Sequence, residues 1–361
     1  MVKKIKEKKI IFFLPTFALG GASDSIFILS KFLVKKNFSI LVVSIGKNDY
    51  RNEFIKLGCD IIEINSKRSL FSIFKLRKII KNEIKKEYLN TILISNIHYA
   101  NIISLIACFK IKKLKIVLTE RSSLSELNIF NNFISFIKNK LILLLAKYLY
   151  HFSDLVITNS IYEKKYIKNE FKVKNVKCIH PPSIKNINKN FKKIKKFEKK
   201  RFIYVGRLSS EKGVDIIINA LSIVNKKYKF LFKIYGEGKD KLMLQNLVKS
   251  YRMQKKIIFK GFSSNKDRIF NNTDLFINAS KFEGLPNAMV QSLNYSTFPI
   301  CTNSPGGNME VIKFGKLGLS FKTDDIFDLK KKIEFFIRNK LRLNNKIRIK
   351  HLKKFTEENS N

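Results

Sequence analysis

The sequence predicts an α/β protein with two doubly wound, mostly parallel sheets, in two domains that face a cleft. Two observations predict this fold class. Short runs rich in β-branched and aromatic residues alternate with stretches of about 10–15 residues in which apolar residues recur at helical spacing. The alternation breaks at Pro181 and Pro182 and starts again at Arg201. Because strands that alternate with such helices form right-handed βαβ units, each half should contain one open sheet.

The strands of the first half are short apolar runs bounded by polar residues. The first, at 9–17, is followed by Gly20 and Gly21, which open a helix expected at 22–35. Further strands are expected at 39–45, 60–64, 91–95, 115–119, 154–158 and 176–179, and further helices at 70–86 and about 98–109.

The second half repeats this pattern. Its helices should include two that begin at Val214 and Lys239. Open α/β sheets bind ligands beyond the carboxyl ends of their strands, so the loops at those ends are the candidates for a site. Strands are expected at 201–205, 230–235, 257–260, 274–278, 298–302 and 318–321.

The best linker candidate is the segment 185–200. It holds eight Lys and one Glu, with few large apolar side chains, and it follows the two prolines. We therefore expect an N-terminal domain at 1–184, this Lys-rich linker, a C-terminal domain at 201–345 and a basic, polar tail at 346–361.

The chain is strongly basic, with a formal net charge of +44. Nucleic acid, an anionic membrane surface and phosphorylated substrates are the partners that such a charge suits. A recognition helix, zinc fingers and interleaved basic and aromatic residues are all missing from the sequence, so we predict no nucleic-acid partner.

The cysteines and the N-terminus indicate a cytosolic protein. The four cysteines are scattered singly without a CxxC pair, which predicts reduced thiols and no metal site. The apolar run at 10–14 is too short for a spanning helix, so we read it as a strand.

The stretch 133–152 has apolar residues at helical spacing, interrupted by Lys138, Lys140 and Lys147. Two interpretations stay open. It forms either a basic amphipathic helix that lies on a membrane or a core helix with lysines on its outer face.

The segment 280–291 carries the strongest candidate site residues. Pro286 is well placed as the first residue of a helix, so Glu283 should lie in the loop just before that helix. A helix N-terminus suits phosphate or an electron-rich sugar oxygen. Asn287 and Gln291 are four residues apart and share a helix face, which predicts a carboxylate and two carboxamides around one small volume. A plain N-capping loop fits the local spacing equally well.

A second candidate follows the strand at 201–205. Gly206 and Arg207 come first, and Lys212 follows at the entry to a helix. An Arg fork and a Lys point charge beside a helix N-terminus can hold a diphosphate and stabilise the charge that develops as it departs. A surface Arg and Lys in a turn is the alternative.

Weaker signals are Gly21 and His98. The glycine pair after the first strand allows close approach of backbone N–H groups to a phosphate or sugar, but it is not a dinucleotide fingerprint. His98 follows a strand and fits either a site residue or a capping, packed residue.

Taken together, the segments resemble a known family. Three sets of residues carry the resemblance: Gly20-Gly21-Ala22; Val205-Gly-Arg-Leu with Glu211-Lys-Gly; and Glu283-Gly-Leu-Pro-Asn-Ala with Pro305-Gly-Gly and Glu310. They are similar to motifs of the retaining GT-B glycosyltransferases of the family 4 type, also called group 1. The resemblance covers nearly the whole chain, and the two C-terminal motifs are specific in combination.

The resemblance implies roles for these residues. Arg207 and Lys212 would bind the donor diphosphate, and Glu283 would contact hydroxyls of the donor sugar. The other donor-binding positions implied are Gly21, Gly206, Phe262, Gly284, Leu285, Pro286, Asn287 and Gln291, and His98 joins the catalytic set.

The sequence departs from the family pattern at one donor position. A second Glu usually follows eight residues after the first and contacts the ribose hydroxyls, but Gln291 stands there. A carboxamide accepts hydrogen bonds only through its carbonyl and carries no charge, which puts donor affinity in question.

The implied activity is transfer of a hexose or N-acetylhexosamine from a nucleotide sugar, with UDP expected, to a glycan hydroxyl with retention of configuration. The acceptor would be lipid-diphosphate-linked, in polysaccharide or lipopolysaccharide biosynthesis, and the enzyme would be cytoplasmic, on the inner face of the cell membrane. No metal or other cofactor is expected. The alternatives are a UDP-sugar 2-epimerase, which lacks this pairing of motifs, and a nucleic-acid-binding protein.

Overall fold

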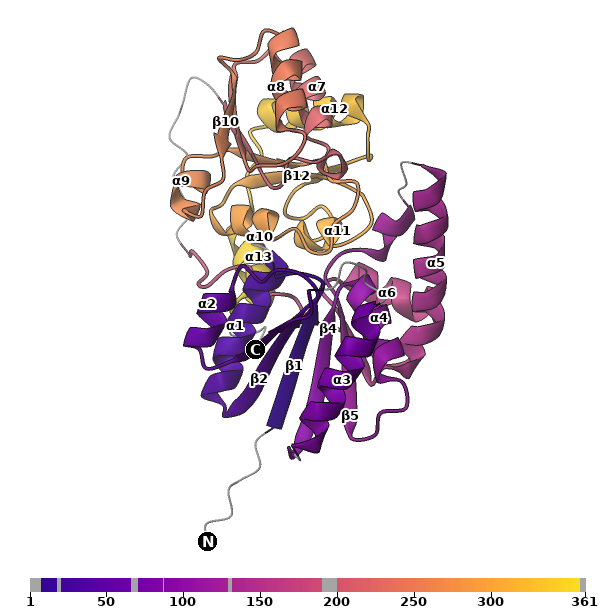
Figure 1. Ribbon diagram of the computed structural model, residues 1–361. Helices are drawn as coiled ribbons and strands as arrows, with labels where there is room; N and C mark the ends of the chain where they lie inside the picture. The colour runs from indigo at the N-terminus through magenta and orange to yellow at the C-terminus, as the bar shows by residue number, and fades with distance from the viewer. Residues whose placement is uncertain are drawn as a thin grey trace. The chain divides into compact units, whose positions relative to one another are not determined.

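The computed structural model describes residues 8–17, 21–65, 71–86, 88–128, 132–189 and 200–357. These residues fall into two compact units, the first ending at Ile179 and the second beginning at His180. Each unit carries one parallel sheet with helices packed against it (Figure 1). The prediction of two doubly wound α/β domains is therefore confirmed.

The first unit alternates strands and helices from its start. Its elements are β1 (Lys8–Leu14), α1 (Gly21–Lys35), β2 (Phe38–Ser44), α2 (Arg51–Lys56), β3 (Asp60–Glu63), α3 (Phe71–Lys85), β4 (Asn90–Asn96), α4 (His98–Cys108), β5 (Leu114–Glu120), η1 (Leu124–Asn128), α5 (Phe133–Leu149), η2 (Tyr150–Phe152), β6 (Leu155–Thr158), α6 (Ile161–Glu170) and β7 (Val176–Cys178).

The strand order of the first sheet is β3-β2-β1-β4-β5-β6-β7. The chain starts in the middle at β1, runs outward to β3 and then returns to β4 on the other side of β1. Both faces of β1 are buried, because Ile10 and Phe12 pack in one core cluster while Ile11 and Phe13 pack in another. Helices on both faces of the sheet explain why the strand reads as a continuous apolar run.

The second unit repeats this architecture. Its elements are β8 (Lys200–Val205), η3 (Ser210–Lys212), α7 (Val214–Val224), β9 (Phe230–Tyr235), α8 (Lys241–Ser250), β10 (Ile257–Gly261), α9 (Lys266–Phe270), β11 (Leu275–Asn278), α10 (Asn287–Asn294), β12 (Phe298–Thr302), α11 (Asn308–Val311), β13 (Leu319–Phe321), α12 (Ile326–Arg338), α13 (Asn345–Leu352) and η4 (Lys353–Phe355).

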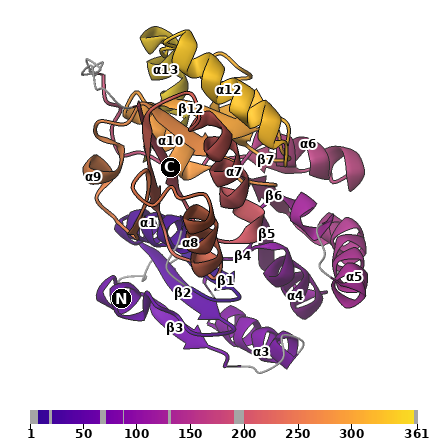
Figure 2. The ribbon, with the colours of Figure 1, turned by 90° about the horizontal axis from the view of Figure 1, so that it is seen from above.

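The second sheet has the order β10-β9-β8-β11-β12-β13. Its order reverses between β8 and β11, as the order of the first sheet reverses between β1 and β4. Figure 2 shows the strands of both sheets from above. At such a reversal the loops that follow the two central strands diverge and leave room for a ligand.

The expected linker and tail differ from the structure. The units divide at His180, before the prolines, and 180–189 belongs to the second unit; of the predicted linker, residues 190–199 lie outside the described residues. In place of a tail, α13 packs into this unit with Arg348 fully buried. Arg348 donates hydrogen bonds to the carbonyls of Leu293 and Asn188 (3.1 and 2.9 Å), so a basic segment is bound by polar contacts that a hydropathy pattern does not reveal.

Candidate active site

The candidate site of the second unit is built by the loops that follow β8 and β11, the two strands at the reversal of strand order. The β8 loop is held against the β11 loop by backbone contacts. The N–H of Lys281 donates to the carbonyl of Glu211 at 2.9 Å. Gly213 has a φ of 62°, and a Cβ there would lie 2.3 Å from the carbonyl oxygen of Ala279. Glycine therefore allows the two loops to touch.

This contact places a cation on a carboxylate. Lys212 Nζ lies 2.8 Å from Glu283 Oε1, and Ser280 Oγ donates to the same oxygen at 2.7 Å. Both charged side chains are partly exposed, at 21% for Lys212 and 16% for Glu283. The structure thus brings together Lys212 and Glu283, which lie 71 positions apart in the sequence.

A third loop, after β12, fixes the backbone of Glu283. The N–H of Glu283 donates to the carbonyl of Pro305 at 3.1 Å, and that of Gly307 donates to Gly284 at 2.9 Å. Gly306 has a φ of 114°, and a Cβ there would fall 1.6 Å from the carbonyl oxygen of Glu283. This close approach explains why glycines stand in the Pro305–Gly307 segment.

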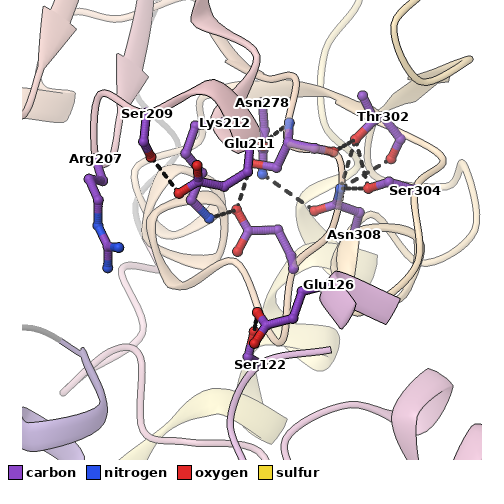
Figure 3. Close-up of polar contacts among 12 residues, drawn as sticks. Ser122, Glu126, Arg207, Ser209, Glu211, Lys212, Asn278, Thr302, Ser304 and Asn308 are labelled. Carbon is purple, nitrogen blue, oxygen red and sulfur yellow. Dashed lines mark hydrogen bonds and ion pairs between the residues drawn. The ribbon is translucent and has the colours of Figure 1, made fainter. Parts of the chain in front are cut away.

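A buried polar network that our sequence reasoning missed joins the end of β11 to the loop after β12 (Figure 3). Asn308 Nδ2 donates to Thr302 Oγ1 and to Ser304 Oγ, at 3.0 and 3.1 Å. Asn278 Oδ1 accepts from the N–H of Ser280 at 2.9 Å, while its amide donates to Asn308. Buried polar groups satisfied in this way hold a loop in one conformation. The feature of the sequence that could have indicated this network is Asn278, a polar residue at the end of the apolar run 274–278.

Gly206 and Arg207 follow β8 directly. The N–H of Gly206 donates to the Tyr235 carbonyl at 3.0 Å, and a Cβ at Gly206 would lie 2.6 Å from the Tyr204 hydroxyl. That hydroxyl donates to the Arg207 carbonyl at 2.8 Å. Burial, and then the Glu283 carboxylate, raise the pKa of Tyr204 well above its usual value, so it remains a neutral donor. The Arg207 side chain is exposed.

The two carboxamides of α10 have partners other than Glu283. Asn287 Oδ1 accepts from Ser183 Oγ at 2.8 Å, and Gln291 Nε2 donates to the Ser183 carbonyl at 3.2 Å. Both residues therefore bind the segment that opens the second unit. Helix α10 begins at Asn287, one residue after the predicted start, with Pro286 at the N-cap.

The remaining predicted donor positions differ in exposure. Gly284, Leu285 and Pro286 are buried at the entry to α10. Phe262 follows β10 and is 79% exposed, so its ring is available to stack on a flat ligand.

His98 and Gly21 lie in the first unit, at the two strands of its own order reversal. Gly21 begins α1 after β1, whereas its neighbour Gly20 lies outside the described residues. His98 begins α4, is 2% exposed, and its Nε2 lies 3.4 Å from Glu126 Oε1. Burial lowers the pKa of His98 to about 4, so the imidazole is neutral at physiological pH.

The backbone beside His98 is strained. Ile97, at the N-cap of α4, has a φ of 75°, a conformation that costs a β-branched residue energy. Its N–H donates to the carbonyl of Thr119 at 3.0 Å, which helps to hold this conformation. Among the described residues, the buried His98 Nδ1 has no hydrogen-bond partner.

No helix in the part of the chain that the structure describes is both long enough and apolar enough to cross a bilayer. Within the same residues, no three His, Cys, Asp or Glu side chains are arranged to hold a metal ion.

Residues 186–355 match the family described as glycosyl transferases group 1. The chain is 26% identical to an uncharacterized glycosyltransferase of Haemophilus influenzae over 342 residues, which covers 92% of this chain and 91% of the relative. It is 25% identical to the GalNAc-alpha-(1->4)-GalNAc-alpha-(1->3)-diNAcBac-PP-undecaprenol alpha-1,4-N-acetyl-D-galactosaminyltransferase of Campylobacter jejuni, covering 92% of this chain and 89% of that one.

Among solved structures, the chain is similar to Anabaena Alr3699/HepE in complex with UDP-glucose, with a TM-score of 0.72 and 18% identity over 96% of this chain and 93% of that one. This likeness agrees with the predicted GT-B fold, while the cleft between the domains remains a prediction. The segment that matches the group 1 glycosyl transferases contains the whole candidate site of the second unit.

Proposed function

We propose that this group 1 glycosyltransferase moves a hexose or N-acetylhexosamine from a UDP-sugar to a hydroxyl of a lipid-diphosphate-linked glycan, with retention of configuration. The observation that carries the proposal is the pairing of Lys212 with Glu283 at the strand-order reversal of the second sheet. A fixed cation and a fixed acceptor side by side match two adjoining parts of a nucleotide sugar, its diphosphate and its sugar hydroxyls.

In this mechanism the bond between the sugar C1 and the β-phosphate oxygen breaks, and the nucleoside diphosphate leaves with the electron pair. The acceptor oxygen forms its bond to C1 on the same face, and its proton passes to the departing phosphate oxygen. Lys212, with Arg207 from the same loop, stabilises the negative charge that grows on the diphosphate. Glu283 accepts hydrogen bonds from the sugar hydroxyls and orients the ring.

The other predicted residues fit around these two. Gly206 and Gly284 allow close backbone approach, and the N-terminus of α10 favours negative charge beside it. Phe262 would stack on the base, Gln291 would offer its carbonyl to the ribose, and neutral His98 and Gly21 of the first unit would contact the donor sugar. None of these steps calls for a metal ion or another cofactor.

The substrate class is supported by relatives. The Campylobacter jejuni relative is named for a diphospho-undecaprenol-linked glycan, and the Anabaena structure contains UDP-glucose. A lipid-linked acceptor would place the enzyme in the cytoplasm on the inner face of the cell membrane, in polysaccharide or lipopolysaccharide biosynthesis.

A product assay tests the proposal. The purified protein is incubated with a panel of UDP-sugars and undecaprenyl-diphosphate-linked glycans, and products are analysed by mass spectrometry and by NMR of the new anomeric centre. We expect acceptor-dependent UDP release, one added sugar with the donor's configuration, and no loss of rate in EDTA. Inversion at the anomeric carbon, or epimerised UDP-sugar without transfer, would contradict it.

A further inference from the structure

The outer side of α5 carries a stripe of exposed apolar side chains. Phe133, Ile137, Leu141, Leu144 and Tyr148 are between 51% and 74% exposed. Their spacing of four, four, three and four residues places them within about 80° of one another around the helix axis. Phe152, just after the helix and 59% exposed, extends the stripe. We call these six residues the α5 face.

The opposite side of α5 fixes which way this face points. Ile142 and Ala146 are buried in the core of the first unit. Beyond the end of the helix, the hydroxyl of Tyr150 donates to the carboxyl of Glu120, at the end of β5. Figures 1 and 2 both show α5 on the outside of its unit, next to α4. The helix therefore cannot rotate its apolar stripe into the core without breaking these contacts.

The α5 face is surrounded by positive charge. Lys140 and Lys147 lie along one side of the stripe and Lys138 along the other, and all three are exposed. The helix contains no acidic residue. The stripe continues to Phe109, whose ring packs edge to face on Phe152 with centroids 5.8 Å apart.

Past Phe109 the chain adds Lys110, Lys112 and Lys113, all exposed. This surface matches the two layers of an anionic bilayer surface. Its aromatic and aliphatic groups suit the acyl boundary, and the lysines beside them, with no carboxylate among them, suit the charged headgroups. A second copy of the chain would bring the same lysines against each other, which is unfavourable.

We propose that the α5 face binds an anionic membrane surface, with its apolar side chains in the headgroup boundary and its lysines on lipid phosphates. The inference rests on the proposed function and deepens it. It identifies the surface of the first unit that would bind the membrane in which the acceptor lipid lies. Membrane binding itself requires neither donor nor acceptor, so it can be measured apart from transfer.

The test is flotation of the purified protein with vesicles of 30% phosphatidylglycerol in phosphatidylcholine (roughly the anionic content of a charged leaflet) at physiological salt. We expect the wild-type protein to float with these vesicles and not with pure phosphatidylcholine. The variant K138E/K140E/K147E should partition about 100-fold more weakly, because each lysine near an anionic surface strengthens binding several-fold. The variant F133S/I137S/L141S/L144S should bind at least about tenfold more weakly.

Matched controls change the same chemistry elsewhere. K168E/K249E/K255E reverses three exposed lysines, and F71S/F74S/L242S/F327S removes four exposed apolar groups, and none of these residues belongs to the α5 face. Both should float as the wild type does. Because every substituted residue is exposed, thermal melts should coincide.

Equal flotation of the α5 and control variants would overturn the proposal. So would wild-type binding to neutral vesicles as strong as to anionic ones. A dimer in lipid-free solution that the α5 substitutions dissociate would assign the face to self-association instead. Transfer to a short-chain, water-soluble acceptor should be unchanged in the α5 variants, so a failure of the proposed transfer reaction would appear separately from a failure of membrane binding.

Discussion

The contact between Lys212 and Glu283 affects how a donor would enter. Their 2.8 Å contact satisfies two charges that are each about four-fifths buried. A nucleotide sugar would have to exchange this contact for new ones, its diphosphate binding to Lys212 and its hydroxyls to Glu283. The two side chains thus hold each other in place, which lowers the ordering cost of binding.

The first prediction concerns Lys212→Ala. We expect kcat/KM to fall at least about 100-fold, because one fixed charge on the leaving group is worth roughly 3 kcal/mol in the transition state. The free energy of unfolding should change by only about 1 kcal/mol, since the ion pair is partly exposed. UDP release measures the change in kcat/KM, and thermal melts measure the change in stability. Lys241→Ala removes an exposed pair with Glu237 in the same unit and serves as the control; wild-type turnover in Lys212→Ala would refute the role.

Gln291→Glu tests whether this position binds the donor ribose. A carboxylate accepts a charge-assisted hydrogen bond from a hydroxyl, so the KM for the donor should fall several-fold. Stability should drop by about 1 kcal/mol, because the new side chain no longer donates to the Ser183 carbonyl. Donor titrations and urea unfolding provide the measurements. A lower stability with an unchanged KM would mean that Gln291 serves only to bind Ser183.

The charged residues of the site were predictable from the sequence, but their supports were not. Glu283 and Lys212 lie in the loops that follow apolar strands, so their place at the sheet edge follows from the order of elements. The network of Asn278 and Asn308 was missed because single Asn residues near turns are common. Whether such an amide is buried depends on contacts from segments distant in the sequence.

At the level of elements, α5 is joined to the sheet by a polar cluster. Glu120 Oε1 accepts from the Tyr150 hydroxyl and from Asn101 Nδ2, the latter at 2.8 Å. Burial, the largest effect, raises the pKa of Glu120 to about 8, so the carboxyl is mostly protonated at neutral pH. Burial likewise raises the pKa of Glu163 to about 7.

This cluster predicts that stability falls as the pH rises from acidic to slightly alkaline values. The ordinary pKa of Glu120 is 4.5, so between that value and about 8 the folded state binds more protons than the unfolded state. The stabilising contribution is therefore complete below pH 4.5 and is lost once the pH has risen through about 8. We expect the free energy of unfolding to fall between pH 4.5 and about 8, to level off above that, and to fall less in Glu120→Gln, which cannot ionise.

Urea unfolding at a series of pH values measures this slope. Glu170→Gln, an exposed residue at the end of α6, is the control and should keep the wild-type slope. Glu163 leaves some pH dependence in every variant. Parallel curves for the wild type and Glu120→Gln would show that Glu120 does not titrate in this range.

Strands were easier to predict than helices in this chain. The predicted strands 230–235 and 298–302 agree with β9 and β12 at both ends, because each is a short run of mostly apolar residues. Helix α13 was missed because its eight residues include two Lys, one Arg and one His and form no apolar stripe. Its place depends on hydrogen bonds from Arg348 to distant carbonyls.

At the scale of the molecule, the chain enters the second unit at His180, and residues 180–189 are bound there from two sides. The N–H groups of Ser183 and Ile184 donate to the Phe355 carbonyl at 3.0 and 3.2 Å. On the other side, Asn294 of α10 bonds the backbone of Asn188 and Asn186. The sequence could not show this, because a segment with prolines and lysines has the composition of a linker.

Arg348→Met tests how much this arrangement contributes. Arg348 is fully buried and donates to the carbonyls of Leu293, Asn294 and Asn188. Methionine fills similar space without a donor, so we expect a loss of about 3 kcal/mol in the free energy of unfolding of the second unit. Arg342→Met changes an exposed arginine nearby and should cost less than about 0.5 kcal/mol. Equal urea midpoints for the two variants would refute this account of α13.

The chain passes from the first unit to the second at His180, but a cut at that point would not leave two separate halves. Residues 180–189 are covalently continuous with the first unit, yet their hydrogen bonds belong to the second. A protease site introduced within 190–199 would produce an N-terminal fragment that ends in a ten-residue peptide still bound by α10 and α13. The two fragments are expected to copurify, and the same position would serve as the break for a split form of the protein assembled from separately expressed halves.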